Sequence, residues 1–512
     1  MYNRILIYTV FFTSFFAYAH AGDLKQLAKL FAEDVKYAPR DTYEEYISSR
    51  GHGPVFISER KIIEGNSDRT YSKAVSKIMV LTESGIYPDI STEVQRYIND
   101  IHNVFGCTVV SFQISSSISA ELMKDLIISE NDSGAIDGAV LIGDLPAAWF
   151  EVENDFNEYG YAEFPCDLFL MDLDGSWIDS DSNGKYNSHT GLVNPEVFVG
   201  RISTANMGDL TSEIQGMKDY LDKNHNFWTG VTSVNLQKGL TYTDRDWMEY
   251  SDFLYDISNL YSLFDAVSAY NSYFGKIDYL GRLSGGTYEF VQLSCHSNWT
   301  LHRMYGPTPE DSEDILTNEI FSLPLKSIAY NLFCCSGVRW TNTDYLGFLG
   351  GAYVYNTDSK ALVSTGSTKT GSMLGFSYFY SPLQTEKVFG TALKQWWVNY
   401  VGTFHDFDEI CWFYGMSIIG DPMIDPKYVA PAAPAVPLNV TTSVSGTDIY
   451  IFWDAVSGAA SYKIYGSDDP YAPDPWTLLD SVSGTSYIYS GTENRKFFKI
   501  IASTDSVIRQ NR

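Results

Sequence analysis

The sequence has few cysteines and comparatively few basic residues. Six cysteines in 512 residues are too few for a disulfide scaffold, so most are expected to be small buried hydrophobic residues. Against 63 aspartates and glutamates there are 35 lysines and arginines, which gives a formal net charge of −28. This charge argues against nucleic acid as a partner, because the chain would repel its phosphates.

Long apolar runs are absent after the first twenty residues, so no membrane span is expected in the mature chain. Residues 1–21 themselves are typical of a secretory signal peptide. Arg4 precedes an apolar stretch, and Ala19-His20-Ala21 fits a small-x-small cleavage site. The sequence therefore predicts a secreted protein, extracellular or on the cell surface.

Strands and helices alternate from Ser76 onward, which predicts an α/β fold. Apolar runs at 77–81, 107–114 and 138–144 are separated by amphipathic helical patterns. Strand-helix-strand order favours right-handed crossovers and a parallel sheet. The alternation of strand and helix patterns restarts near residue 230, so we expect two α/β subdomains with mostly parallel sheets, at 76–230 and 231–428.

Two other regions flank this unit. Residues 22–75 form a pro-segment or an N-terminal decoration, and the pattern does not decide which. A Pro/Ala linker at 429–437 is followed at 438–505 by short strands of period two, which predict a small all-β sandwich. Trp453 and Tyr462 make this module resemble fibronectin type III domains, and surface attachment is one expected role for it.

Two apolar runs of strand length end at reactive side chains. Within residues 288–297 the apolar run stops at His296, and within residues 325–337 it stops at Cys334 or Cys335. The carboxyl ends of parallel strands meet at one edge of a sheet, where a thiol nucleophile and a general base could face each other. The 38 residues from 296 to 334 leave room for one crossover helix, which we expect at 311–321.

Several stretches, taken in order, resemble the gingipain-type cysteine peptidases of the caspase-like clan. The resemblance spans 76–424 and implies a caspase-like three-layer sandwich, cysteine endopeptidase activity on protein or peptide substrates, and no cofactor for catalysis. It rests on Val140-Leu-Ile-Gly-Asp144, Pro165-Cys-Asp167, Pro195-Glu-Val-Phe-Val-Gly-Arg-Ile202, Leu293–Trp299, Phe333-Cys-Cys-Ser-Gly337 and Trp412–Pro422.

By this resemblance, His296 is the general acid and base and Cys334 is the nucleophile. The related caspase pattern, Cys-x-Gly, would select Cys335 instead. Cys334 is favoured because Cys335 would point to the opposite face of a continuing strand. The amides of Cys334 and Ser297 would hold the oxyanion, although the family usually has glycine where this chain has Ser297.

Other residues carry secondary hypotheses. The resemblance places Asp167 at the floor of a specificity pocket, which would favour Arg or Lys before the scissile bond; a solvated or metal-bound carboxylate is the alternative. Trp299 is expected in a wall of the cleft, and His302 is a backup base. A carboxylate that orients the histidine would come from one of four acidic residues: Glu151, Glu153, Asp155 or Glu158.

Alternating oxygen ligands suggest one structural metal site. Asp179, Asp181 and Asn183, followed by Gly184, match the first half of a calcium loop, although Thr190 stands where an EF-hand has its closing glutamate. Structural Ca²⁺ is therefore a hypothesis, with an ordinary acidic turn as its alternative.

Two further hypotheses concern the site as a whole. The first is an inactive peptidase-like surface or binding protein. The second is a zinc site formed by two adjacent pairs, whose ligands lack the usual spacing: Cys295, His296, Cys334 and Cys335.

Overall fold

The computed structural model describes residues 41–51, 53–65, 75–155, 160–191, 194–232, 236–308, 311–385, 387–405, 407–430, 435–471, 476–491 and 496–503. The expected signal peptide at 1–21 lies outside the described residues, as do positions 431–434 of the expected linker. None of the helices described has both the length and the apolar character that crossing a bilayer requires.

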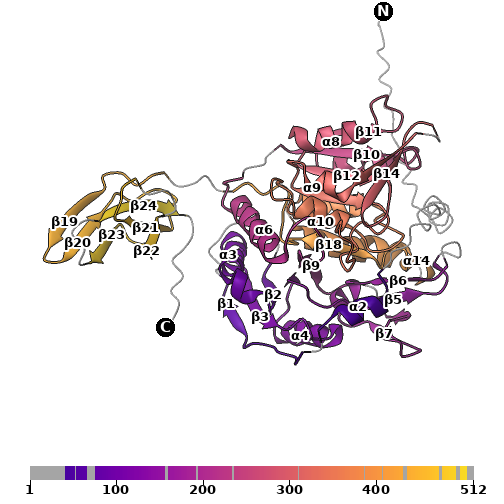
Figure 1. Ribbon diagram of the computed structural model, residues 1–512, viewed down its shortest axis with the longest axis horizontal. Coiled ribbons are helices and arrows are strands. Elements are labelled where there is room, and N and C mark those ends of the chain that lie inside the picture. Colours follow the sequence, from indigo (N-terminus) through magenta and orange to yellow (C-terminus); the bar gives the residue numbers. More distant parts are fainter. Residues whose placement is uncertain are drawn as a thin grey trace, which may run out of the picture.

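One large sheet runs through the body of the described chain (Figure 1). Its pairs are parallel except at β1–β3 and β17–β18, so the predicted α/β fold with a mostly parallel sheet is confirmed. The strand order is β1 (Lys61–Ile63), β3 (Thr108–Ile114), β2 (Lys77–Glu83), β4 (Gly138–Ile142), β9 (Phe198–Ile202), β18 (Met416–Gly420), β17 (Val363–Ser367), β16 (Ala329–Phe333), β12 (Phe290–Ser294), β10 (Lys238–Thr243) and β11 (Leu263–Ser268).

Strand β18 joins the two halves of this sheet. It comes from the end of the second half, yet it pairs in parallel with β9 of the first half, where Ile419 lies opposite Arg201. Its other neighbour, β17, runs antiparallel to it. The expected pair of sheets is therefore one continuous sheet.

Helices cover both faces of the second half, which gives three layers. Adjacent residues of a strand point to opposite faces. In β16, the Tyr330 ring packs 4.5 Å from that of Tyr353 in α10 (Leu349–Val354), whereas the next side chain, Asn331, donates to the hydroxyl of Tyr380 in α11 (Ser377–Gln384) at 3.2 Å.

The remaining elements complete these layers and the loops between strands. The helices are α2 (Tyr43–Ser49), α3 (Tyr87–Phe105), α4 (Ala120–Ser133), α5 (Leu168–Met171), α6 (Glu213–Trp228), α7 (Ser251–Tyr255), α8 (Lys276–Gly285), α9 (Thr317–Phe321), α12 (Phe389–Trp396), α13 (Gly402–Phe404) and α14 (Phe407–Ile410). Two single-turn segments are Asp256–Asn259 and Trp397–Val401. Small hairpins pair β5 (Trp149–Val152) with β6 (Ala162–Pro165) and β7 (Ser176–Ile178) with β8 (Ser188–Thr190).

The connection from β12 to β16 differs from the expected crossover helix at 311–321. Residues 312–316 form β15 (Ser312–Leu316), which pairs with β14 (Leu301–Tyr305), and only α9 is helical. Arg303 and Asp314 face each other across β14 and β15 at 2.8 Å, a charged cross-strand pair that favours sheet pairing here. The prediction of a helix was wrong for the first half of this segment.

The N-terminal segment is anchored in the body of the protein. Helix α2 packs Tyr46 against Trp149, with ring centroids 5.3 Å apart. Just before it, the carboxylate of Asp41 accepts from Arg339 at 2.7 Å, and both side chains are buried. Strand β1 extends the edge of the main sheet beside β3. The described parts of residues 22–75 are therefore integral to packing.

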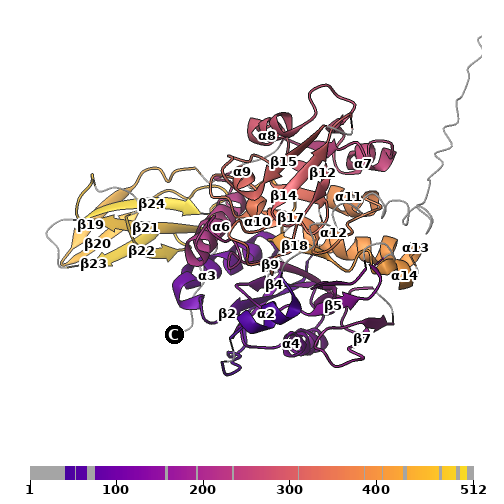
Figure 2. The ribbon, with the colours of Figure 1, turned by 45° about the vertical axis from the view of Figure 1, so that its right-hand side comes forward.

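The C-terminal region is the small all-β sandwich that the sequence predicts, and it lies beside the larger body (Figure 2). Its core contains Trp453 and Tyr462, with ring centroids 5.3 Å apart. The two three-stranded antiparallel sheets, within the described residues, are β19 (Thr441–Ser445), β20 (Asp448–Phe452) and β23 (Ser486–Ser490), and β22 (Thr477–Val482), β21 (Ser461–Ser467) and β24 (Phe497–Ser503). Its likeness to fibronectin type III stays a prediction.

Candidate active site

The segments that carry His296 and the cysteine pair leave the sheet side by side. Strands β12 and β16 are parallel neighbours, and Ser294 lies opposite Phe333 at their carboxyl ends. Beyond this point the Cys295 amide donates to the Phe333 carbonyl at 3.2 Å, and the Ser297 hydroxyl donates to the Cys335 carbonyl. The sheet therefore delivers an imidazole and two thiols to one edge.

His296 is held by a carboxylate and two aromatic rings. Its Nε2 lies 2.8 Å from Oδ2 of Asp246, and its ring packs 4.7 Å from that of Trp247 and 5.0 Å from that of Tyr305. Burial alone would raise the pKa of Asp246, but the hydrogen bond from His296 and the nearby Arg245 guanidinium bring it below its usual value. An ionised carboxylate only accepts, so Nε2 carries the proton and Nδ1 keeps a lone pair that can act as a base.

Asp246 was missed among the carboxylates that sequence reasoning considered. Glu151 pairs with Lys185 and Asp155 pairs with Lys369, both at 2.9 Å; Glu153 is exposed, and Glu158 lies outside the described residues. The sequence does contain a pattern that points to Asp246. Strand β10, the neighbour of β12, also ends in polar residues, Thr243-Asp-Arg-Asp246, so the strand-end rule that located His296 applies to it.

The two cysteines lie in a turn. Strand β16 ends at Phe333, and the Cys334 amide donates back to the Leu332 carbonyl at 2.9 Å. The strand does not continue through the two cysteines, so a strand's alternation of faces does not exclude Cys335. The same hydrogen bond engages the Cys334 amide, so the expected role of this amide in holding the oxyanion is not supported.

Gly337 has a steric role beside Cys334. A Cβ atom at position 337 would lie 2.6 Å from the Cys334 sulfur, so any larger residue there would collide with it. Ser336 before it has a positive φ of 54°, which turns the chain back toward the sulfur. The Cys-x-x-Gly spacing thus lets the Cys334 sulfur pack against the backbone at Gly337.

Ser297 occupies ordinary backbone. It lies in β13 (His296–Ser297), opposite His302 of β14, in extended conformation that any residue adopts. Glycine is therefore not required at this position, and the departure from the family pattern creates no backbone strain.

His302, the backup base, belongs to a separate buried cluster. Its Nδ1 lies 3.4 Å from the Cys295 sulfur and its Nε2 lies 3.0 Å from the Tyr353 hydroxyl. Burial lowers the pKa of His302 to about 3, so this imidazole stays neutral. Among the described residues, the groups arranged to hold a metal contain no cysteine, which disfavours the four-residue zinc site.

Asp167 and Trp299 are both buried. Asp167 accepts three hydrogen bonds from Arg201, at 2.8, 3.0 and 3.1 Å, so its charge is neutralised inside the protein. The Trp299 carbonyl accepts from the Leu349 amide at 2.7 Å, which ties its loop to the start of α10. A substrate side chain could use the Asp167 carboxylate only by displacing Arg201.

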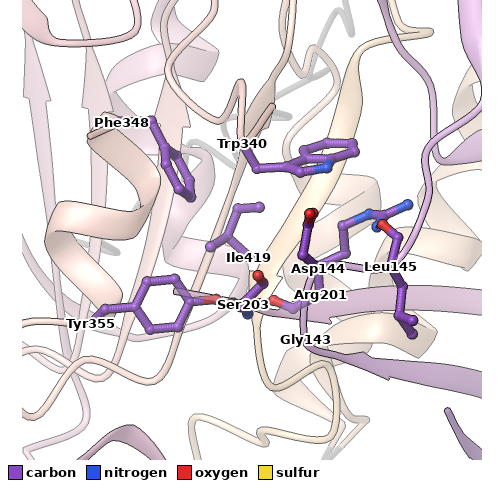
Figure 3. A pocket seen from close by; sticks show the side chains of 9 residues that line it. All are labelled: Gly143, Asp144, Leu145, Arg201, Ser203, Trp340, Phe348, Tyr355 and Ile419. Carbon is purple, nitrogen blue, oxygen red and sulfur yellow. Dashed lines mark hydrogen bonds between the residues drawn. The ribbon is translucent and has the colours of Figure 1, made fainter. Parts of the chain in front are cut away.

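A hollow at the carboxyl ends of β4 and β9 contains this arginine (Figure 3). Its guanidinium lies under the Trp340 ring, 4.6 Å from the centroid, and the Asp144 carboxylate pairs with Arg50 at 3.2 Å. The lining residues are Gly143, Asp144, Leu145, Arg201, Ser203, Trp340, Phe348, Tyr355 and Ile419. Neither His296 nor either cysteine of the pair is among them.

The loop considered for calcium forms a hydrogen-bonded turn between β7 and β8. Both carboxylate oxygens of Asp179 accept backbone amides, from Asn183 at 3.2 Å and Gly184 at 2.8 Å. The side-chain amide of Asn183 donates to the carboxylate of Asp181 at 3.0 Å and to that of Glu151 at 2.9 Å. Calcium binding here stays a prediction.

Comparison with known proteins gives remote structural likeness only. No family model matches the chain, and no curated protein matches it. A crystal structure of the Arg-specific cysteine proteinase gingipain R is 13% identical, with 85% of this chain and 97% of that chain covered and a TM-score of 0.49. A complex of the pro- and mature domains of RgpB from Porphyromonas gingivalis is 14% identical, with 84% and 94% covered and a TM-score of 0.48.

Proposed function

We propose that the chain is an exported cysteine endopeptidase that hydrolyses peptide bonds in protein or peptide substrates. The observation that carries the proposal is the pairing of His296 with Asp246 at a strand end beside the turn that holds Cys334 and Cys335. A thiol, a base, and a carboxylate that orients the base are the parts that nucleophilic acyl transfer needs.

In this mechanism Cys334 gives its proton to Nδ1 of His296 and attacks the peptide carbonyl. The imidazolium then protonates the leaving amine, and a water molecule hydrolyses the acyl-enzyme. Asp246 holds the tautomer and stabilises the imidazolium through the 2.8 Å contact. Because the Cys334 amide is engaged with Leu332, the proposal keeps Ser297 alone as the expected oxyanion donor.

Cys334 is preferred to Cys335 because its Cys-x-x-Gly spacing matches the nucleophile of the family that the sequence resembles, and because Gly337 accommodates its sulfur. The proposal assigns no preference for Arg or Lys, because Arg201 already neutralises Asp167. The residue preference before the scissile bond is therefore left to measurement with a set of substrates.

A second candidate function is an inactive, peptidase-like binding protein. The burial of the dyad favours it: His296 is 1% exposed, Cys334 0% and Cys335 2%. A peptide can reach these groups only if covering side chains move. In this case the fold would present surfaces to a partner without cleaving it.

Hydrolysis of a mixed peptide library by the wild-type chain and three single variants separates these functions. We expect cleavage by wild type and Cys335→Ala, and loss of cleavage in Cys334→Ala and His296→Ala by at least about 10³-fold. Thermal unfolding of each variant shows whether it is folded. Equal cleavage by wild type and His296→Ala, or none by a folded wild-type chain, contradicts the proposal.

A further inference from the structure

A second carboxylate lies beside the His296–Asp246 pair. Asp244 is fully buried, and Asp244, Asp246 and His296 each offer one ligand atom, all within 4.8 Å of one another. Oδ1 of Asp244 accepts the Asp246 amide at 2.9 Å. Among the described residues, its Oδ2 is buried and makes no hydrogen bond of ordinary geometry, and the backbone of Tyr305 lowers the pKa of the carboxyl less than His296 and the backbone of Asp246 do. A buried carboxylate oxygen without a partner needs a proton or a cation.

We propose that Asp244, Asp246 and His296 form a site for a zinc-like divalent cation that switches off the general base. Two carboxylates and one imidazole supply three protein ligands and leave further positions for water, which is the pattern of open zinc sites. The imidazole nitrogen favours Zn²⁺ over Ca²⁺ and Mg²⁺, which prefer oxygen ligands throughout.

Charge and access also favour a cation. When ionised, the two aspartates carry two negative charges, while Arg245, whose Nε lies 3.5 Å from Oδ1 of Asp246, supplies one positive charge. The cluster therefore keeps a net negative charge that a divalent ion can neutralise. The Asp246 side chain is 21% exposed, so an ion can enter from its side.

Binding would change the tautomer of His296. The cation replaces the proton that now lies between Nε2 and Asp246, and a neutral imidazole coordinated through Nε2 carries its proton on Nδ1. That nitrogen then has no lone pair with which to accept the thiol proton. The inhibitory effect rests on the proposed peptidase function, whereas cation binding does not.

Calorimetric titration of the full-length chain with ZnCl₂ tests the site without requiring activity. We expect Asp244→Asn to weaken binding at least about tenfold, since even outer-sphere partners of a metal contribute that much. Asp252→Asn, which removes a carboxylate of α7 that belongs to neither group of candidate metal ligands among the described residues, is the matched control and should bind as wild type does. Unchanged binding in Asp244→Asn overturns the inference.

Two further readouts identify the ligands and separate this inference from the proposed function. Co²⁺ bound in place of Zn²⁺ should show no thiolate charge-transfer band, and binding should survive in the Cys334→Ala/Cys335→Ala double variant. Loss of binding in that variant means that the thiols are the ligands and overturns the site. Asp244-dependent binding to a chain without peptidase activity contradicts the proposed function and leaves the cation site standing.

Discussion

Buried carboxylates have different partners at the two edges of the main sheet. At the carboxyl ends of β4 and β9, Asp167 is matched by the guanidinium of Arg201, with three hydrogen bonds and a tryptophan ring over the cation. At the ends of β10 and β12, Asp246 contacts a titratable imidazole at 2.8 Å and Arg245 at 3.5 Å, and Asp244 keeps an oxygen without a hydrogen-bond partner among the described residues. Fully matched charge stabilises a fold, whereas unmatched charge marks a place where protons or ligands exchange.

Breaking the matched edge should have the largest effect. Arg201→Met leaves Asp167 buried without its partner, so we expect the free energy of unfolding to fall by about 3–5 kcal/mol. Denaturant unfolding monitored by tryptophan fluorescence measures it. The double variant Asp167→Asn/Arg201→Met should recover part of the loss, and a fall below about 1 kcal/mol in the single variant would show that the pair is not essential to this edge.

Altering the histidine partner should lower the reaction rate and leave stability almost unchanged. Asp246→Asn cannot hold the productive tautomer of His296 as an ionised acceptor does, so kcat should fall by about 10²-fold or more with little change in KM. Steady-state kinetics on a cleaved peptide gives both values. Asp252→Asn, which removes another carboxylate from the following helix, should behave as wild type; equal losses in both variants would mean that Asp246 has no specific role.

The buried carboxylate of Asp244 should make the free energy of unfolding depend on pH. Burial raises the pKa of Asp244 to about 7, so between about pH 4 and 7 the folded state binds more protons than the unfolded state, and this group destabilises the fold as pH rises. Asp244→Asn should therefore gain stability relative to wild type above pH 7 and lose that advantage near pH 4. Parallel unfolding curves across this range test it, and a constant difference at every pH would contradict it.

Calcium should have the smallest effect. If the loop at Asp179 binds Ca²⁺, a free concentration ten times the Kd stabilises the fold by about 1.4 kcal/mol. Melting temperature with and without Ca²⁺ measures this, with Asp179→Asn as the control that should not respond. If Ca²⁺ raises the melting temperature of the variant as much as that of wild type, the ion binds at another site.

The sequence was most informative where long apolar runs end at one polar residue. That pattern located β12 and β16, the strands that lead to His296 and to the cysteine pair, because buried parallel strands are recognisable by composition alone. The sequence was less informative about which buried side chains contact each other. Arg201 lies 34 residues from Asp167, and their bidentate contact depends on the packing of β9 against a loop that no local pattern specifies.

Two local errors have physical reasons. The segment 312–316 pairs with β14 because tertiary contacts, including Arg303 with Asp314, outweigh its expected helical role in the crossover. The choice between Cys334 and Cys335 assumed that β16 continues, but the chain turns at Phe333 and brings Gly337 back to the sulfur. Turns of this kind depend on backbone hydrogen bonds that side-chain periodicity does not report.

Covalent labelling tests the central claim most directly. The folded, full-length chain is treated with peptidyl acyloxymethyl ketones that carry arginine, lysine or leucine before the ketone, and the adduct is mapped by mass spectrometry. The account predicts one adduct on Cys334 that disappears in His296→Ala and is strongly reduced in Asp246→Asn. An adduct on Cys335 alone, or labelling of Cys334 that is equally fast without His296, would contradict it.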